Sequence, residues 1–136
     1  MGRILAIDFG KKRSGIAVSD ELKIIASGLT TVFTNKLLEF LKKYTTDEKV
    51  DLFIIGKPKR LNNTDSEIEV LITEFLKKLS DKIPDIPIKR IDERFSSKIA
   101  FKTMIDIGVS KKKRQNKFLI DKISATVILQ SYLYYK

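Results

Sequence analysis

A short apolar run in the middle of the chain does most to limit the folds open to it. Leu52-Phe53-Ile54-Ile55 shows no alternation of apolar and polar residues, and Gly56 and Pro58 follow it closely. A strand with one wet face would alternate, so this run is typical of a strand that is covered on both faces. It predicts a sheet with helices packed on either side.

The rest of the chain supplies the other strands and the helices. The first third indicates a meander of three strands, Arg3–Phe9, Gly15–Ser19 and Ile24–Phe33, with an irregularity at Gly28, and Pro87–Ile91 predicts a second inner strand. Apolar residues at helical spacing predict helices over 36–44, 64–79, Ser96 or Ser97 to 107, and 116–133. This order predicts an α/β domain over residues 1–136, with a mixed five-stranded sheet in which an antiparallel meander joins parallel strands.

Composition excludes several kinds of chemistry. The 136 residues include no cysteine and no histidine, so thiol nucleophiles, disulfides, histidine general bases and imidazole zinc sites are excluded. Carboxylates, hydroxyls, lysines and an oxygen-bound cation remain. We expect a cytoplasmic protein with no membrane partner, because no apolar stretch has the length of a signal peptide or a membrane span.

The charge balance points to a polyanionic partner. Lysine and arginine total 27 against 17 acids, a formal net charge of +10. Such an excess suits nucleic acid. A lysine-rich surface can also reflect compositional bias, so charge alone leaves both interpretations open.

Strand ends single out two acids. Asp8 closes the first strand, and Glu93 follows the Pro87–Ile91 strand. Because side chains alternate along a strand, Glu93 faces the same side as Ile91 and Asp92 faces the other. In mixed α/β sheets, sites form beyond the carboxyl ends of the parallel strands.

The last predicted helix supplies a third acid. Asp121 lies on the helical face that carries Ala125, Ile128 and Tyr132, so it is expected beside the core. A favourable interaction with the helix dipole is the alternative explanation for an acid at this position.

The three acids together have a chemical logic. Carboxylates such as Asp8, Glu93 and Asp121 repel one another when brought close, and a divalent cation removes that cost. Hard oxygen ligands suit Mg²⁺ or Mn²⁺, which can activate water against a phosphodiester and stabilise the leaving oxygen. We therefore predict a metal-dependent nuclease with these three residues as catalytic metal ligands, in which Gly10 lets backbone approach closely.

Four segments resemble one known family, the YqgF/RuvX family of nucleases. They are Asp8-Phe9-Gly10 with Gly15–Asp20, Gly56-Lys57-Pro58 with Asn62-Asn63-Thr64, Asp92-Glu93-Arg94-Phe95-Ser96-Ser97, and Asp121–Ala125 leading into Ile128–Leu133. The order matches over essentially the whole chain. Asn62-Asn63 stands where the family has Asp-Gly, and Ser97 replaces its commoner threonine.

The resemblance implies a ribonuclease H-like fold and a nuclease that matures the 5′ end of pre-16S ribosomal RNA. It also implies an alternative, a Holliday junction resolvase acting on four-way DNA, because the family is similar to RuvC. Carried over by position, its acids are Asp8, Glu93 and Asp121. RuvC-type resolvases carry a fourth carboxylate where this chain has Ser124 and Ala125, so the resemblance leaves one or two metals open.

Basic residues near the predicted site are expected to contact substrate phosphates. For the early turn a solvated surface is the alternative, and for Arg94 a salt bridge. The expected partners are pre-rRNA, with ribosomal assembly intermediates, or alternatively branched DNA, bound by a monomer or a homodimer. The substrate-binding residues predicted in this way are Lys11, Lys12, Arg13, Lys57, Lys59, Arg60 and Arg94.

Two further function classes compete with the nuclease. An actin-like phosphotransferase also places an Asp-x-Gly hairpin beside phosphate, but it needs two such domains, and the sequence contains no second hairpin of this kind. A nucleic-acid-binding module that has lost its chemistry is the other. Asp8→Asn and Glu93→Gln would separate that module from an enzyme.

Overall fold

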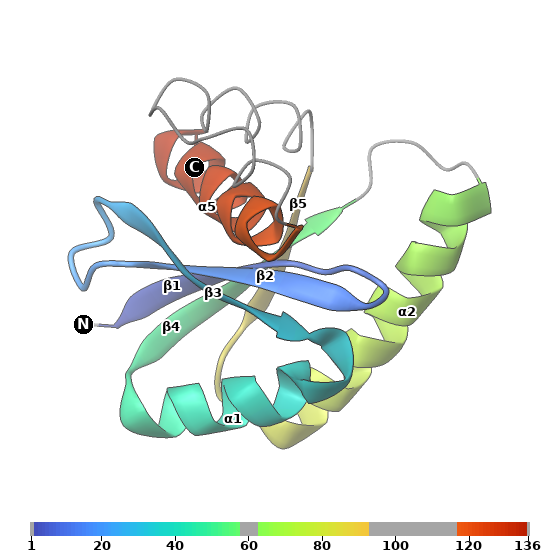
Figure 1. Cartoon of the computed structure of the whole chain (residues 1–136). Coiled ribbons are helices and arrows are strands. Elements are labelled where there is room, and N and C mark those ends of the chain that lie inside the picture. Colours follow the sequence, from blue (N-terminus) through green and yellow to red (C-terminus); the bar gives the residue numbers. More distant parts are fainter. Residues whose placement is uncertain (1, 58–62, 93–116, 136) are drawn as a thin grey trace.

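The computed structural model describes residues 2–57, 63–92 and 117–135, which form a five-stranded sheet with helices on both faces (Figure 1). The order across the sheet is β3-β2-β1-β4-β5. β1 pairs antiparallel with β2 and β2 with β3, whereas β4 runs parallel to β1 and β5 parallel to β4. The predicted mixed sheet is confirmed. Its strands are β1 (Arg3–Asp8), β2 (Arg13–Ser19), β3 (Ala26–Phe33), β4 (Val50–Lys57) and β5 (Ile88–Asp92).

The helices divide between the two faces of the sheet. In Figure 1, α5 (Lys117–Tyr135) covers one face, and α1 (Leu37–Asp47) and α2 (Asn63–Lys82) lie on the other. A 3₁₀ turn, Thr34–Lys36, leads from β3 into α1. The helix predicted to end at Ile107 lies outside the described residues. No helix in the described part of the chain is long and apolar enough to cross a membrane.

Alternation along the central strands builds two cores. Leu5 and Ile7 of β1 join the core under α1 and α2, whereas Ile4 and Ala6 join the core under α5. β4 behaves in the same way, since Ile54 packs toward α5, whereas Phe53 and Ile55 pack toward α1 and α2. The continuous apolar run in β4 is therefore explained as predicted: the strand is buried from both sides.

β3 begins two residues later than the sequence predicts. The Asp20 carboxylate accepts hydrogen bonds from the backbone N–H groups of Ile24 and Ile25, at 2.7 and 2.8 Å, and so holds them in the β2–β3 turn. The predicted irregularity is present as a register shift that leaves Leu29 without a partner beside Gly28.

Candidate active site

The register of the central strands places Asp8 on the α5 face. Asp8 is the last residue of β1 and lies two positions after Ala6, which packs under α5. Its partner across the strand pair is Gly15 of β2. Because β1, β4 and β5 are parallel, Asp8 also marks the edge where their carboxyl ends gather.

Asp121 reaches the same place from α5. A Cβ on Gly15 would overlap the backbone carbonyl oxygen of Asp121, so the missing side chain lets the helix rest directly on β2. Since Gly15 lies opposite Asp8, the backbone of Asp121 packs over the strand pair at the level of Asp8. The structure thus brings two of the three predicted acids to one end of one face. The predicted helix stripe is also confirmed, because Ala125 and Ile128 are buried.

Arg13 forms an ion pair with Asp121. Its Nε donates a hydrogen bond to Oδ2 of Asp121 at 2.9 Å, and both side chains are about three-quarters buried. The guanidinium also lies over the ring of Phe118, 5.7 Å from its centroid. That ring packs edge-on against Phe33 at 5.5 Å, and Thr31 Oγ1 donates to the carbonyl of Phe118. The start of α5 is therefore fastened to β2 and β3 around this pair.

The electrostatics of Asp121 follow from its position. Burial raises the pKa of its carboxyl above the ordinary value, and the hydrogen bond and charge of Arg13, with a smaller effect of Lys117, oppose that rise. A largely buried carboxylate of this kind needs a cation beside it to remain ionised at little cost. The Arg13 guanidinium supplies that charge, and a hard divalent ion bound to the carboxylate oxygens would supply it too.

A ring of hydroxyl groups fixes the β1–β2 turn that follows Asp8. Thr34 Oγ1 donates to the carbonyl of Gly10 at 2.6 Å, and the N–H of Gly10 donates to Ser14 Oγ at 3.4 Å. The ring closes through the 2.8 Å contact between the hydroxyls of Ser14 and Thr34, in which Ser14 donates when Thr34 gives its proton to Gly10. Ser14 and Thr34 were not predicted from the sequence. The signal for Ser14 was a polar residue on the strand face that also carries Ile16 and Val18.

The other predicted residues are only partly placed. Lys11 and Lys12 are exposed in the β1–β2 turn, and Lys57 ends β4. Ile91 packs on the α5 side. Alternation along the strand predicts Glu93 on the same side as Ile91, which is therefore the α5 side. Within 2–57, 63–92 and 117–135, no group of three acids forms a metal site. Predicted residues outside the described ranges are Glu93, Lys59, Arg60 and Arg94.

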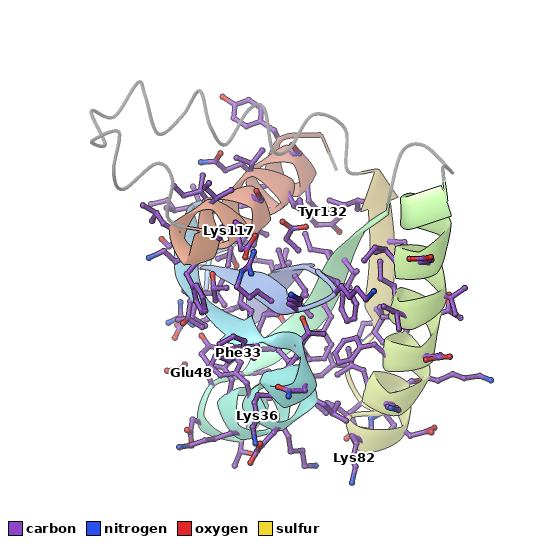
Figure 2. All side chains as sticks on the ribbon, turned by 45° about the vertical axis from the view of Figure 1, so that its right-hand side comes forward. Phe33, Lys36, Glu48, Lys82, Lys117 and Tyr132 are labelled. Carbon is purple, nitrogen blue, oxygen red and sulfur yellow. The ribbon has the colours of Figure 1, made fainter. Side chains whose placement is uncertain are left out.

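A second cation lies farther along the α5 face. Figure 2 shows Lys117 and Tyr132 near opposite ends of α5, above the sheet. Lys89 of β5 places its ammonium 5.2 Å from the centroid of the Tyr132 ring, which itself packs against the core. Core packing and the Lys89 contact therefore account for the position of this tyrosine.

The sequence of this chain matches one family model and several named proteins. Residues 2–135 match the family model described as "RuvX: Holliday junction resolvase". A protein of Christiangramia forsetii named "Putative pre-16S rRNA nuclease" is 57% identical over 134 residues, covering 98% of this chain and 99% of its own. A protein of the same name from Flavobacterium johnsoniae is 56% identical, covering 98% and 96%.

Two solved structures have a similar fold. T. thermophilus RuvC in complex with a Holliday junction substrate aligns with a TM-score of 0.60 at 12% identity, covering 98% of this chain and 94% of that one. Fowlpox virus resolvase in complex with Holliday junction DNA aligns at 0.56 and 13%, covering 97% of both chains. At these identities the likeness concerns the fold alone, and the expected ribonuclease H-like architecture is confirmed.

Proposed function

Because this chain belongs to the RuvX family, we propose that it is a metal-dependent nuclease that hydrolyses phosphodiester bonds in the 5′-end maturation of pre-16S ribosomal RNA. Relatives named as pre-16S rRNA nucleases, at 57% and 56% identity over nearly the whole chain, support the reaction and the substrate. The observation that carries the proposal is the placement of Asp8 and Asp121 at one end of the α5 face.

In this proposal Asp8, Asp121 and Glu93 would hold Mg²⁺ or Mn²⁺. Such an ion would activate a water molecule for attack on the phosphodiester and would neutralise charge on the leaving oxygen. The hydroxyl ring around Gly10 keeps the turn after Asp8 in one conformation, so that this carboxylate meets the ion without further ordering.

The remaining cations bind and orient the substrate. Lys11 and Lys12, exposed in the β1–β2 turn after Asp8, contact substrate phosphates. Arg13, Lys57, Lys59, Arg60 and Arg94 complete the phosphate-binding set. The net charge of +10 draws in a polyanion, here pre-rRNA within ribosomal assembly intermediates of the cytoplasm.

The test in cells is the sequence of ribosomal RNA ends after depletion of this protein. Pre-16S RNA with an extended 5′ end should accumulate, and the wild-type chain but not Asp8→Asn should restore the mature end. In vitro, the purified protein with Mg²⁺ should cut a pre-16S leader, and EDTA should stop it. Normal 5′ ends in depleted cells would contradict the proposed substrate.

The second candidate is a resolvase of four-way DNA junctions. The description of the matching family, a Holliday junction resolvase, favours it. A resolvase should be a stable dimer that makes paired, symmetric cuts. Incubating the protein with a pre-16S leader and with a four-way junction, each with Mg²⁺, separates the two candidates by which one is cut.

A further inference from the structure

Arg13 is predicted to bind substrate, yet the structure places it on a predicted metal ligand. Its Nε contacts Oδ2 of Asp121 at 2.9 Å, and its guanidinium lies against Phe118. A divalent ion on the same carboxylate would lie within a few ångströms of the guanidinium. Two like charges that share one carboxylate in a three-quarters buried site repel each other strongly.

The contacts of Arg13 also show how it can yield. The Asp121 bond uses Nε, and the Phe118 contact places the guanidinium carbon Cζ over the ring. A cation–π contact depends on where the charge lies over the ring, so the guanidinium can stay over Phe118 while its N–H groups turn to another acceptor. About a quarter of the side chain is exposed, which lets an acceptor reach it. A phosphate fits the planar fork of arginine.

We propose that Arg13 exchanges partners: it holds Asp121 while no metal is bound, gives up the carboxylate when the ion binds, and turns its guanidinium to a phosphate of the nucleic acid. Metal binding and nucleic-acid binding are then coupled through one side chain. The exchange rests on the proposed function, because it assumes that Asp121 is a metal ligand and that phosphate is the substrate.

The exchange differs measurably from a fixed ion pair. If Arg13 competes with the ion, removing it should strengthen metal binding. If it only steadies Asp121, removing it should weaken metal binding or leave it unchanged. Because linked binding is reciprocal, the exchange also requires metal to strengthen nucleic-acid binding through Arg13, whereas a fixed pair does not.

The first measurement is the Mn²⁺ affinity of the protein without nucleic acid, determined by calorimetry. Arg13→Gln should bind Mn²⁺ more tightly than wild type, by about 5-fold or more. Arg13→Lys keeps the charge and should stay close to wild type. Arg90→Gln is the matched control, because Arg90 forms a similarly buried ion pair with Glu69, at 2.7 Å, on the α2 side. It should leave Mn²⁺ affinity unchanged.

The second measurement is binding of a fluorescent pre-16S leader RNA by anisotropy, in EDTA and in Ca²⁺, which occupies oxygen sites with little cleavage. Ca²⁺ should tighten RNA binding to wild type by about 5-fold. In Arg13→Gln that gain should fall to nearly nothing, and Arg13→Lys should lose most of it because an ammonium lacks the fork. Arg90→Gln should keep it.

Each outcome bears on one proposal or the other. Weaker or equal Mn²⁺ binding by Arg13→Gln, or an undiminished Ca²⁺ gain, overturns the exchange while wild-type cleavage keeps the proposed function. A wild-type protein that binds Mn²⁺ but cuts no nucleic acid overturns the proposed function, and the Mn²⁺ affinities alone then decide the exchange. A wild-type protein that binds no Mn²⁺ overturns both. If Arg13→Gln fails to fold, Arg13→Lys decides through its RNA gain.

Discussion

Thr34 is a single residue on which the shape of the turn after Asp8 depends. Its hydroxyl donates to the Gly10 carbonyl and accepts from Ser14, whose own hydroxyl is fully buried. Removing the Thr34 hydroxyl takes the donor from the Gly10 carbonyl and the acceptor from the Ser14 O–H, while Ser14 Oγ still accepts from the Gly10 N–H. A buried polar group that loses its hydrogen bond costs about 1–3 kcal/mol.

Thr34→Val should therefore lower the free energy of unfolding by about 1–3 kcal/mol in urea titrations. Valine has nearly the shape of threonine, so the hydroxyl is the only substantial loss. Thr34→Ser keeps the hydroxyl and should stay within about 1 kcal/mol of wild type. Equal losses in the two variants would show that the methyl group, not the ring of hydroxyls, is what matters.

Which residues the sequence can reveal depends on how local their signal is. The placement of Asp8 and Asp121 is predictable, because a strand end and a helical stripe are visible within a few residues. The partner of Arg13 is not, since 108 residues separate it from Asp121 and the three cations of the turn look alike in the sequence. Only the strand register, which turns Arg13 toward α5 and leaves Lys11 and Lys12 in the turn, tells them apart.

The contact between β2 and α5 depends on the absence of a side chain at one position. At Gly15 an added Cβ would meet the backbone of Asp121, which cannot move without shifting the helix. At Gly28 an added Cβ would instead meet the side chains of Lys122 and Thr126, at 2.8 and 3.0 Å, and the lysine chain can turn away.

Gly15→Ala should thus destabilise the protein by at least about 1–3 kcal/mol, the usual cost of overpacking, and should weaken Mn²⁺ binding by lifting Asp121 away from Asp8. Gly28→Ala should cost clearly less and leave Mn²⁺ binding intact. Urea unfolding and calorimetry check both. Similar effects from the two alanines would mean that α5 adjusts freely on the sheet.

The β2–β3 turn is tied to the start of β4 by a carboxylate. Oδ2 of Asp51 accepts from the backbone N–H of Gly2 and from Lys23 Nζ, both at 2.9 Å. The Lys23 hydrogen bond, followed by that of Gly2, lowers the pKa of Asp51 below its ordinary value. Backbone N–H groups of the turn, Ile25 first, lower the pKa of Asp20 in the same way.

A carboxyl whose pKa is lowered by folding stabilises the native state above its unfolded pKa, and this stabilisation is lost as the pH falls through the folded pKa. The melting temperature of wild type should accordingly drop below pH of about 4. Asp51→Asn should melt lower at neutral pH and show a shallower drop in acid. The matched control is Glu39→Gln, at a well-exposed acid, and a curve like that of Glu39→Gln would contradict this reasoning.

Helices and strands could be predicted from the pattern of apolar residues along them. Their ends could not be predicted where a side chain binds the backbone. The order of strands and helices in the described ranges follows from helical periodicity and from short apolar runs. The start of β3 does not, because Ile24 and Ile25 look like strand residues in the sequence. Their N–H groups are bound by the Asp20 carboxylate, a contact that a propensity argument does not anticipate.

At the scale of the whole molecule, the net charge of +10 predicts nucleic-acid binding that weakens with salt. Which lysines contribute to that binding depends on where they lie on the surface. Lys11 and Lys12 are exposed in the turn after Asp8, and Lys42 and Lys43 are also exposed, on α1, which lies on the sheet face away from α5. The two pairs carry the same charge, so long-range attraction treats them alike and only direct phosphate contact distinguishes them.

Replacing Lys11 and Lys12 with glutamine should therefore weaken RNA binding and reduce the steepness of its salt dependence. Loss of two phosphate contacts should lower the slope of log K against log salt by about 1.4 for single strands and about 1.8 for duplex. The Lys42→Gln, Lys43→Gln pair makes the same change in net charge and should leave that slope nearly unchanged. Anisotropy titrations in EDTA at several KCl concentrations give all three slopes. If both double variants shifted the slope alike, the RNA would follow the overall charge of the molecule and would have no preferred path beside Asp8.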